Sequence, residues 1–431
     1  MLRQRAAGGK KERFMASPKQ PFNVYLEFEQ SRWLDSMEGV PSYEPATPAA
    51  LTGERDLKFP WQKQLHRMFD RAGGLAPGIA LAVVLAALAG LLANWFGRTV
   101  LGFDKSPISP ILVTVILGLI LRNTLGLPKA YESGLRFCLK RILRIGVALL
   151  GLRLSITAAG SIGLAALPVV IGCIVSALLV VTWLSRWIGL SPRLGSLIAV
   201  GTSICGVSAI VATGPAIGAD EDEISYSVAV ITLFGMVALF TYPFLAYWIF
   251  GGDAQLAGYF LGTAIHDTSQ VAGAGLMYEM QFDSPEALDV AATTKLVRNV
   301  CMGLVIPLMA ILHHRKTAVA KASKKMRWLK WSQFVPLFVI GFVVLAAVRS
   351  IGDVGETPFG FVSPETWRQL LAYSQQISVF CLTAAMAAVG LGTSFWQLRN
   401  LGWKPFGMGF AAAVLVGCVS ASLILVKQWL V

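Results

Sequence analysis

Long apolar runs separated by short polar stretches make up most of the chain from residue 77 onward. Several runs approach or exceed the ~20 residues that an α-helix needs to cross a bilayer. The ~10-residue alternating segments of a membrane β-barrel are not apparent. We therefore predict an all-α polytopic membrane protein with about 11 transmembrane helices, over residues 77–97, 107–122, 136–154, 162–188, 194–215, 223–250, 256–279, 286–312, 331–349, 367–394 and 405–427.

The loops between these runs alternate in charge along the chain. Basic loops contain Arg122 and Lys129, Arg186 and Arg193, residues 313–330, and Arg399 and Lys404. The intervening loops, residues 218–223, 278–289 and 352–360, are acidic or neutral. Because Lys and Arg collect in cytoplasmic loops, we predict a multi-pass protein of the bacterial inner membrane with a cytoplasmic N-terminus and a periplasmic C-terminus.

Residues 1–72 form a separate, more polar region. The stretch from Met1 to Arg13 is basic, and no apolar segment with a cleavage site follows it, so a signal peptide is not expected. We predict a cytoplasmic N-terminal extension, partly disordered, with short helices near residues 24–37 and 62–71. Residues 73–431 would then form the transmembrane transporter domain.

The composition agrees with this class, since charged residues make up only 14% and mean hydropathy is +0.62, against roughly 25% charged residues in soluble domains. Cytoplasmic loops explain the net charge of +13 better than nucleic acid does, because no known motif with a basic, aromatic-interleaved patch is present. The six cysteines show no CxxC spacing, and no nucleotide-binding motif occurs. We therefore expect no nucleic-acid partner, no metal site, no cofactor and no direct use of ATP.

Two pairs of segments resemble each other within the chain. GTSICGVSAI at 201–210 resembles GTAIHDTSQV at 262–271, and GLRLS at 151–155 resembles GLGTS at 390–394. Seven predicted spans separate the second pair, so its members would cross in opposite directions, as in an inverted repeat. The first pair lies two spans apart and would run parallel if every segment spans fully. We predict an inverted repeat, although one simple duplication does not explain both resemblances.

The first pair also has the composition of an interrupted transmembrane helix, because glycine and small hydroxyl residues are concentrated there. A broken helix offers free N–H groups to an anion at one end and free carbonyls to a cation at the other. Close helix packing through small residues is the alternative. The candidate substrate-binding residues of these segments are Gly201, Thr202, Ser203 and Cys205, and Gly262, Thr263, His266 and Ser269.

Charged residues inside the apolar runs add candidate chemistry. Asp267 would carry a proton or coordinate a cation, since an intramembrane carboxylate usually faces a pathway or a partner. His266 titrates near neutral pH in its unperturbed state, but a structural, hydrogen-bonded histidine is an equal alternative. Lys295 and Arg298 lie three residues apart on one helical face and would bind an anion. An ion pair of these two cations with Asp267 is the alternative.

These segments, with LFGMVALFTYP, TKLVRNV, LLGLRLS and AAVGLGTSFWQLRNLGWKP, resemble the sulfate exporter family of bacterial inner-membrane proteins, the YeiH type. The resemblance covers residues 77–430 approximately, and several motifs occur in the expected order. It implies a relationship to the sodium/proton antiporter and bile-acid transporter fold, with panel and core domains and interrupted helices that cross at mid-membrane. Where the family often has glutamate after the histidine, this chain has Asp267.

We therefore expect a secondary transporter that exports a small anion, such as sulfate, sulfite or an organosulfonate, by alternating access coupled to H⁺ or Na⁺. Its partners would be the anion, the coupling ion and the lipid bilayer, and a homodimer is compatible with this class. A membrane-embedded enzyme is the first competitor. However, His266 and Asp267 point about 100° apart on a helix, and neither HExxH nor GxSxG occurs. The second competitor is a sensor or scaffold that uses the N-terminal extension.

Overall fold

The apolar runs fold into helices throughout the part of the chain that the computed structural model describes, which is residues 60–100, 109–314, 337–355, 357–394 and 402–430. Six helical segments are long and apolar enough to cross a membrane. The protein is therefore an all-α polytopic membrane protein, as predicted. Most of the N-terminal extension and the basic loop after His314 lie outside the described residues.

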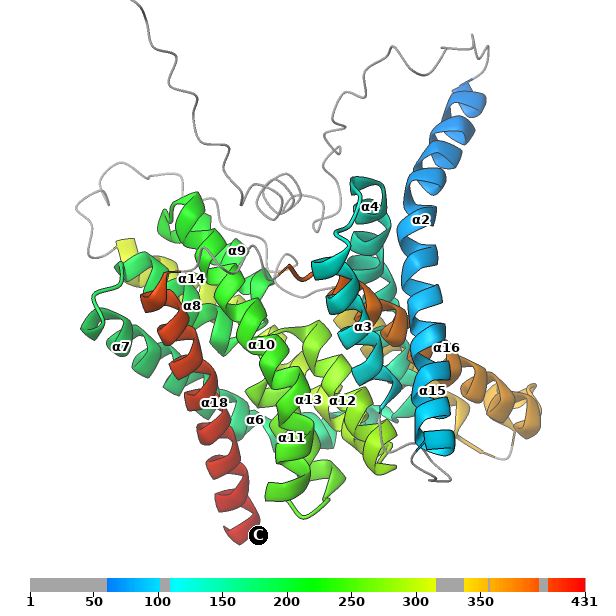
Figure 1. The fold of residues 1–431 in the computed structure, drawn as a ribbon. Helices are drawn as coiled ribbons and strands as arrows, with labels where there is room; N and C mark the ends of the chain where they lie inside the picture. Colours follow the sequence, from blue (N-terminus) through cyan, green and yellow to red (C-terminus); the bar gives the residue numbers. More distant parts are fainter. Residues whose placement is uncertain (1–59, 101–108, 315–336, 356, 395–401, 431) are drawn as a thin grey trace, which may run out of the picture.

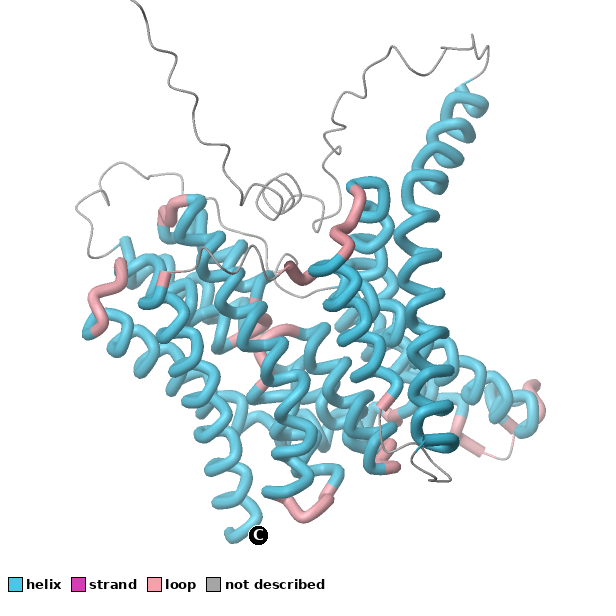
Figure 2. The backbone as a smooth tube through the Cα atoms, viewed as in Figure 1, coloured by secondary structure: helices cyan, strands magenta, loops and turns pink. Residues whose placement is uncertain are grey.

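The helices form two side-by-side groups (Figures 1 and 2). We call the first group the panel. It contains α2 (Pro60–Trp95), η1 (Phe96–Val100), α3 (Pro110–Thr124), α4 (Lys129–Phe137), η2 (Cys138–Ile142), α5 (Leu143–Leu149), η3 (Leu150–Arg153), α15 (Leu337–Gly352), η7 (Pro358–Gly360) and α16 (Pro364–Gly392).

The second group, which we call the core, includes both segments that the sequence marked as interrupted. It contains α6 (Ile156–Ser176), η4 (Ala177–Val181), α7 (Thr182–Trp187), α8 (Pro192–Ser203), α9 (Val207–Ile217), α10 (Glu221–Ile249), α11 (Ala254–Ala264), α12 (Thr268–Phe282), α13 (Glu286–Val300), α14 (Met302–His314) and α18 (Trp403–Leu430).

Glycine allows the panel helices to pack closely. A Cβ on Gly118 of α3 would lie 3.0 Å from Gly390 Cα of α16, and one on Gly78 of α2 would lie 2.7 Å from Gly134 Cα of α4. Close backbone approach through small residues is how helices associate in lipid, where the hydrophobic effect does not drive them together. These positions therefore fix the panel as a tightly packed layer.

The bundle has two ends, which we name from the view of Figure 1. At the upper end α3 turns into α4, and Asn123 Nδ2 donates to Thr393 O at the end of α16 over 3.1 Å. At the lower end α10 turns into α11, and the C-terminal helix α18 finishes there. These contacts give the directions of α3, α10, α16 and α18.

Residues 192–217 do not cross the bundle, which corrects the predicted span 194–215. Helix α8 starts at the upper end, and α9 returns to it. Arg193 at the start of α8 lies 3.8 Å from Asp220, just beyond α9, and Ser191 Oγ donates to Glu223. We call α8–α9 the upper hairpin. The acidic residues 218–223 therefore lie beside Arg193, not on the opposite side as predicted.

Residues 254–282 form a second hairpin, which corrects the predicted span 256–279. Helix α11 starts just after α10 ends, and α12 finishes beside the same end of α10. The ring of Phe282 stacks on that of Tyr247, with centroids 4.1 Å apart. We call α11–α12 the lower hairpin. Nine predicted spans then remain, an odd number, and the location of the two termini on opposite sides stays a prediction.

Because of the hairpins, the two segments of each resembling pair run in opposite directions through the bundle. Helices α8 and α11 enter from opposite ends, so residues 201–210 and 262–271 run antiparallel. The segment at 151–155 ends its helix at the lower end, whereas 390–394 ends its helix at the upper end. Both pairs therefore fit an inverted arrangement, and the parallel relation expected for the first pair is wrong. The repeat itself stays a prediction.

Candidate functional site

The tips of the two hairpins touch in the interior of the core. The upper tip is residues 204–206 and the lower tip is residues 265–267, each between two helices. Gly206 has φ +69° and ψ −122°, which favour glycine. A Cβ at Gly206 would lie 3.3 Å from Cα and Cβ of Asp267. The breaks predicted from composition are therefore present, and glycine is needed where they meet.

Lys295 of α13 donates hydrogen bonds to carbonyls at the C-terminal ends of α8 and α11, the first helix of each hairpin. Its ammonium donates to Ile204 O of the upper tip over 2.8 Å, to Ile265 O of the lower tip over 2.9 Å, and to His266 O. These acceptors use all three N–H groups of a lysine. The Lys295 side chain is fully buried. It therefore occupies the position where a broken helix would otherwise present free carbonyls to a cation.

Arg298 lies one turn further along α13. It also donates to backbone carbonyls at the C-terminal ends of α8 and α11. Nε donates to Ser203 O over 2.7 Å, one terminal nitrogen donates to Thr263 O over 2.6 Å and to Ile265 O over 3.0 Å, and the other donates to Thr202 O. Arg298 is also fully buried. Both cations thus neutralise the negative C-terminal ends of α8 and α11.

Within the described residues, neither cation forms an ion pair with Asp267. The carboxylate instead caps α12. Its Oδ1 accepts from Ser269 N over 2.8 Å and from Ser269 Oγ over 2.5 Å, and Gln270 Oε1 accepts from Asp267 N over 3.3 Å. This capping box satisfies the first N–H groups of α12.

Helix α9 begins beside this carboxylate without a side-chain cap of its own, because its N-cap residue is Gly206. Asp267 Oδ2 would be 3.3 Å from a Cβ on that glycine. The Asp267 carboxylate, which caps α12, therefore also lies beside the N-terminal end of α9. Helix N-terminal ends attract anions, since the dipole is positive there and their first N–H groups have no acceptor within the helix.

The N–H side of the tips is the accessible side. Ser208 is exposed, and Asp267, Thr268 and Ser269 are partly exposed. Asn299 Nδ2 donates to Thr268 Oγ1 over 3.2 Å, while Asn299 Oδ1 is buried and has no partner in the described part of the chain. This side therefore combines N–H ends, hydroxyls and an amide around a carboxylate.

Sequence reasoning missed Ser208, Thr268 and Asn299. Two signals were available. Ser208 occupies in GTSICGVSAI the place that Ser269 occupies in GTAIHDTSQV, and Asn299 directly follows Arg298. Alignment of the two segments therefore identifies the paired serines.

The remaining predicted site residues contribute through backbone or packing. A Cβ on Gly201 would lie 2.7 Å from Ile210 Cδ1, and one on Gly262 would lie 2.7 Å from Ala291 O. Thr202, Ser203 and Thr263 offer their carbonyls to Arg298, and Thr263 Oγ1 also lies 2.6 Å from Ser420 Oγ of α18.

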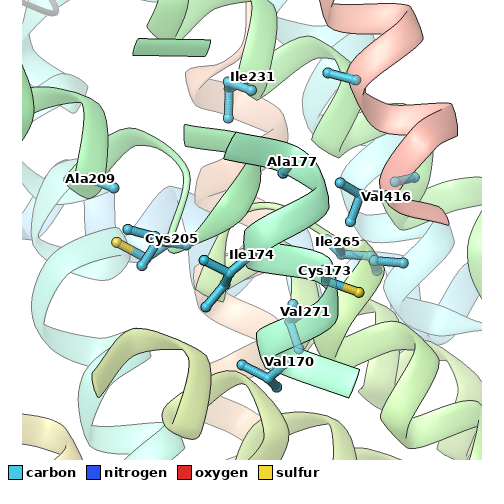
Figure 3. Close-up of a cluster of buried hydrophobic side chains, with 14 of the residues drawn as sticks. Val170, Cys173, Ile174, Ala177, Cys205, Ala209, Ile231, Ile265, Val271 and Val416 are labelled. Atoms are coloured by element: carbon cyan, nitrogen blue, oxygen red, sulfur yellow. The ribbon is translucent and has the colours of Figure 1, made fainter. Parts of the chain in front are cut away.

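Cys205 lies in apolar surroundings, whereas His266 is buried close to the charges of Lys295 and Arg298. The His266 ring is fully buried, and neither ring nitrogen has a hydrogen-bond partner among the described residues. Cys205 belongs to the cluster of Figure 3, where it lies among Ile174, Ala209 and other apolar side chains. Within the described ranges, no three His, Cys, Asp or Glu side chains gather as a metal site.

The family model described as conserved hypothetical protein 698 matches residues 77–409. The chain belongs to the UPF0324 membrane protein family. A UPF0324 membrane protein of Agrobacterium fabrum is 32% identical over 88% of this chain and 99% of its own length. One from Bordetella pertussis is 31% identical over 83% and 93%, and one from Streptococcus mutans is 30% identical over 80% and 95%.

The names of these UPF0324 relatives say only that they are membrane proteins. Membership agrees with the resemblance to YeiH-type proteins, and it leaves residues 1–76 outside the match. No solved structure gives a significant match.

Proposed function

We propose that this UPF0324 protein is a secondary transporter that exports a small anion by alternating access. The observation that carries the proposal is the meeting of two hairpins from opposite ends, with N–H ends on one side of the tips and carbonyl ends on the other. Discontinuous helices of this kind form the substrate and ion sites of many secondary transporters. Sulfate, sulfite and organosulfonates are the candidate substrates.

The charge of the tips favours an anion over a cation. Lys295 and Arg298 contribute +2 and Asp267 contributes −1, so the side chains sum to +1. The two carbonyl ends and the two N–H ends, at about half a charge each, cancel. An anion at the N–H ends of α9 and α12, near Ser208, Thr268 and Ser269, would neutralise this excess.

In this proposal Lys295 and Arg298 attract the anion by their positive charge without bonding to it, because their N–H groups already donate to backbone carbonyls. Asp267 is the coupling residue, since its carboxylate competes with the anion for the same N–H ends. Na⁺ in place of H⁺ is the alternative coupling ion.

No contact among the residues that the structure describes favours the enzymatic alternative. Catalysis by a triad needs a base that holds the nucleophile and is held by a third group. Here Ser269 Oγ bonds to Asp267, and the His266 ring contacts neither through a hydrogen bond.

The test is anion flux into proteoliposomes, with labelled sulfate, sulfite and taurine and with or without a proton gradient. Wild type is compared with Asp267→Asn, because asparagine keeps the N-cap but does not titrate. We expect gradient-driven flux in wild type, and flux that no longer responds to the gradient in Asp267→Asn.

The matched control is Asp220→Asn, which alters the N-cap of α10 at the exposed upper end. It should behave as wild type. Failure of all three anions to move faster than in empty liposomes would overturn the anion proposal. A Na⁺ gradient in place of the proton gradient separates the two coupling ions.

A further inference from the structure

A pocket of about 790 Å³ opens at the lower end, between panel and core and away from the hairpin tips. The panel contributes most of its wall, from η3, α15, η7 and α16, and the core contributes Pro285 and Asp289 beside α13. The mechanism proposed above uses none of these residues.

Charged side chains line much of the pocket. It is lined by three arginines, Arg153, Arg349 and Arg368, and by two carboxylates, Asp289 and Asp353. Arg153 Nε lies 3.0 Å from Asp289, and Arg349 Nε lies 2.6 Å from Asp353. The exposed Arg368 has neither an ion pair nor a hydrogen bond in the described part of the chain. Arg153 also contacts Glu279 over 3.1 Å, so three arginines face three carboxylates, and Arg368 is the guanidinium without an ion pair of its own.

Two further features suit an anion with an organic part. Pro364 at the start of the 29-residue helix α16 lines the pocket, so the N-terminal end of that helix borders it, with Glu365 in its first turn offsetting part of the positive dipole. Leu152, Trp367 and Leu371 supply apolar wall beside the arginines. Trp367 is fixed there, because its Nε1 donates to Asp353 Oδ1 over 3.0 Å.

We propose that this pocket binds the oxyanion group of an organic anion, with Arg368 and Arg349 as the binding residues. Planar guanidinium groups match the geometry of sulfonate, phosphate and carboxylate oxygens. Two sources share this chemistry, a water-soluble organic anion and the headgroup of an anionic lipid. The proposal concerns equilibrium binding and stands whether or not the protein transports the ligand.

The experiment compares wild type with the double variant Arg349→Gln and Arg368→Gln, as purified full chains in uncharged detergent. In the soluble arm, butanesulfonate binding is measured by calorimetry. In the lipid arm, phosphatidylglycerol binding is measured by native mass spectrometry, with phosphatidylcholine as the reference lipid. Arg193→Gln, an exposed arginine of the upper end, is the matched control.

We expect at least one probe to bind wild type and the control alike, and the double variant at least about tenfold more weakly, the effect of losing one charge-assisted hydrogen bond. If butanesulfonate binding is weaker in the double variant, the pocket is a site for a soluble anion. If phosphatidylglycerol binding is weaker, the pocket is a site for a lipid headgroup. If neither probe distinguishes the double variant from wild type, the proposal is wrong. Thermal unfolding of each variant verifies that the fold is intact.

Discussion

At the scale of single residues, the core contains two fully buried cations that donate hydrogen bonds to backbone carbonyls. Burying a charge is costly unless it is paired and hydrogen-bonded. Lys295 and Arg298 meet this condition with the ends of two helices, which supply both acceptors and negative dipole charge. The sequence identified both residues and their shared face. It could not identify the acceptors, because carbonyl groups are common to every residue type.

Replacement of Arg298 tests this arrangement. Arg298→Met leaves the Thr202, Ser203 and Thr263 carbonyls without this donor, so we expect a loss of at least about 3 kcal/mol in stability, at about 1–3 kcal/mol per unsatisfied group. Arg298→Lys should recover only part of it, because an ammonium cannot reproduce the guanidinium fork. Thermal unfolding in detergent is the measurement.

Arg193→Lys and Arg193→Met provide the comparison, since Arg193 is exposed and its ion pair with Asp220 spans 3.8 Å. Surface pairs of this kind contribute about 0–1 kcal/mol. Equal stability losses at positions 193 and 298 would contradict the structural role of Arg298.

At the scale of elements, hydropathy could predict where apolar helices occur but not that two of them return. The upper hairpin contains helices of 12 and 11 residues, which together have the length of one span. A window average cannot distinguish a crossing from a hairpin whose tip is also apolar. The charge pattern also gave a wrong side for residues 218–223. These acidic residues precede and begin α10 at the same end of the bundle as the basic Arg193.

Cysteine labelling tests the hairpins. Single-cysteine variants at Arg193 and Asp222 should react with a membrane-impermeant maleimide from the same side of the membrane, since both lie at the upper end. A variant at Ser284, just beyond α12, should react from the other side. Labelling of positions 193 and 222 from opposite sides would restore the predicted span 194–215.

The tip contact gives a second prediction at this scale. Gly206→Ala places a methyl group 3.3 Å from the Asp267 backbone in a conformation that favours glycine, at a cost of about 1–3 kcal/mol. We expect anion flux to fall while expression persists. Gly218→Ala is the control, because that residue also has positive φ, +66°, but has no atom within 4 Å of the added Cβ. Equal flux in both variants would speak against the tip as the site.

At the scale of the whole molecule, Arg153 links panel to core at the lower end. Its guanidinium contacts Glu279 of α12 over 3.1 and 3.3 Å and Asp289 of α13 over 3.0 Å. One cation thus holds two carboxylates of the core, and all three side chains are largely shielded from solvent. The resemblance implied a panel and a core, but no sequence feature indicated which residue joins them.

We expect Arg153→Gln to destabilise the protein by about 3–5 kcal/mol, because it leaves buried carboxylates without a counter-charge. Glu279→Gln and Asp289→Asn should each cost less, since the arginine keeps one partner. Stability measurements on these single variants, and on Arg153→Gln combined with both neutral substitutions, form the test. The combined variant should regain part of the loss. A further loss would mean that the carboxylates are held by other groups.

The bridging position of Lys295 limits how such a protein can open its centre. Its acceptors belong to both tips, Ile204 above and Ile265 and His266 below, and Arg298 repeats this bridge. If one hairpin moved away from the other to open the site, Lys295 and Arg298 would each lose some of their buried acceptors in every transport cycle. If both tips and α13 move together as one rigid body relative to the panel, none of these hydrogen bonds is broken. At the lower end this motion must release the ion pairs of Arg153 and the 2.7 Å hydrogen bond from Ile156 N of α6 to Ser350 Oγ of α15.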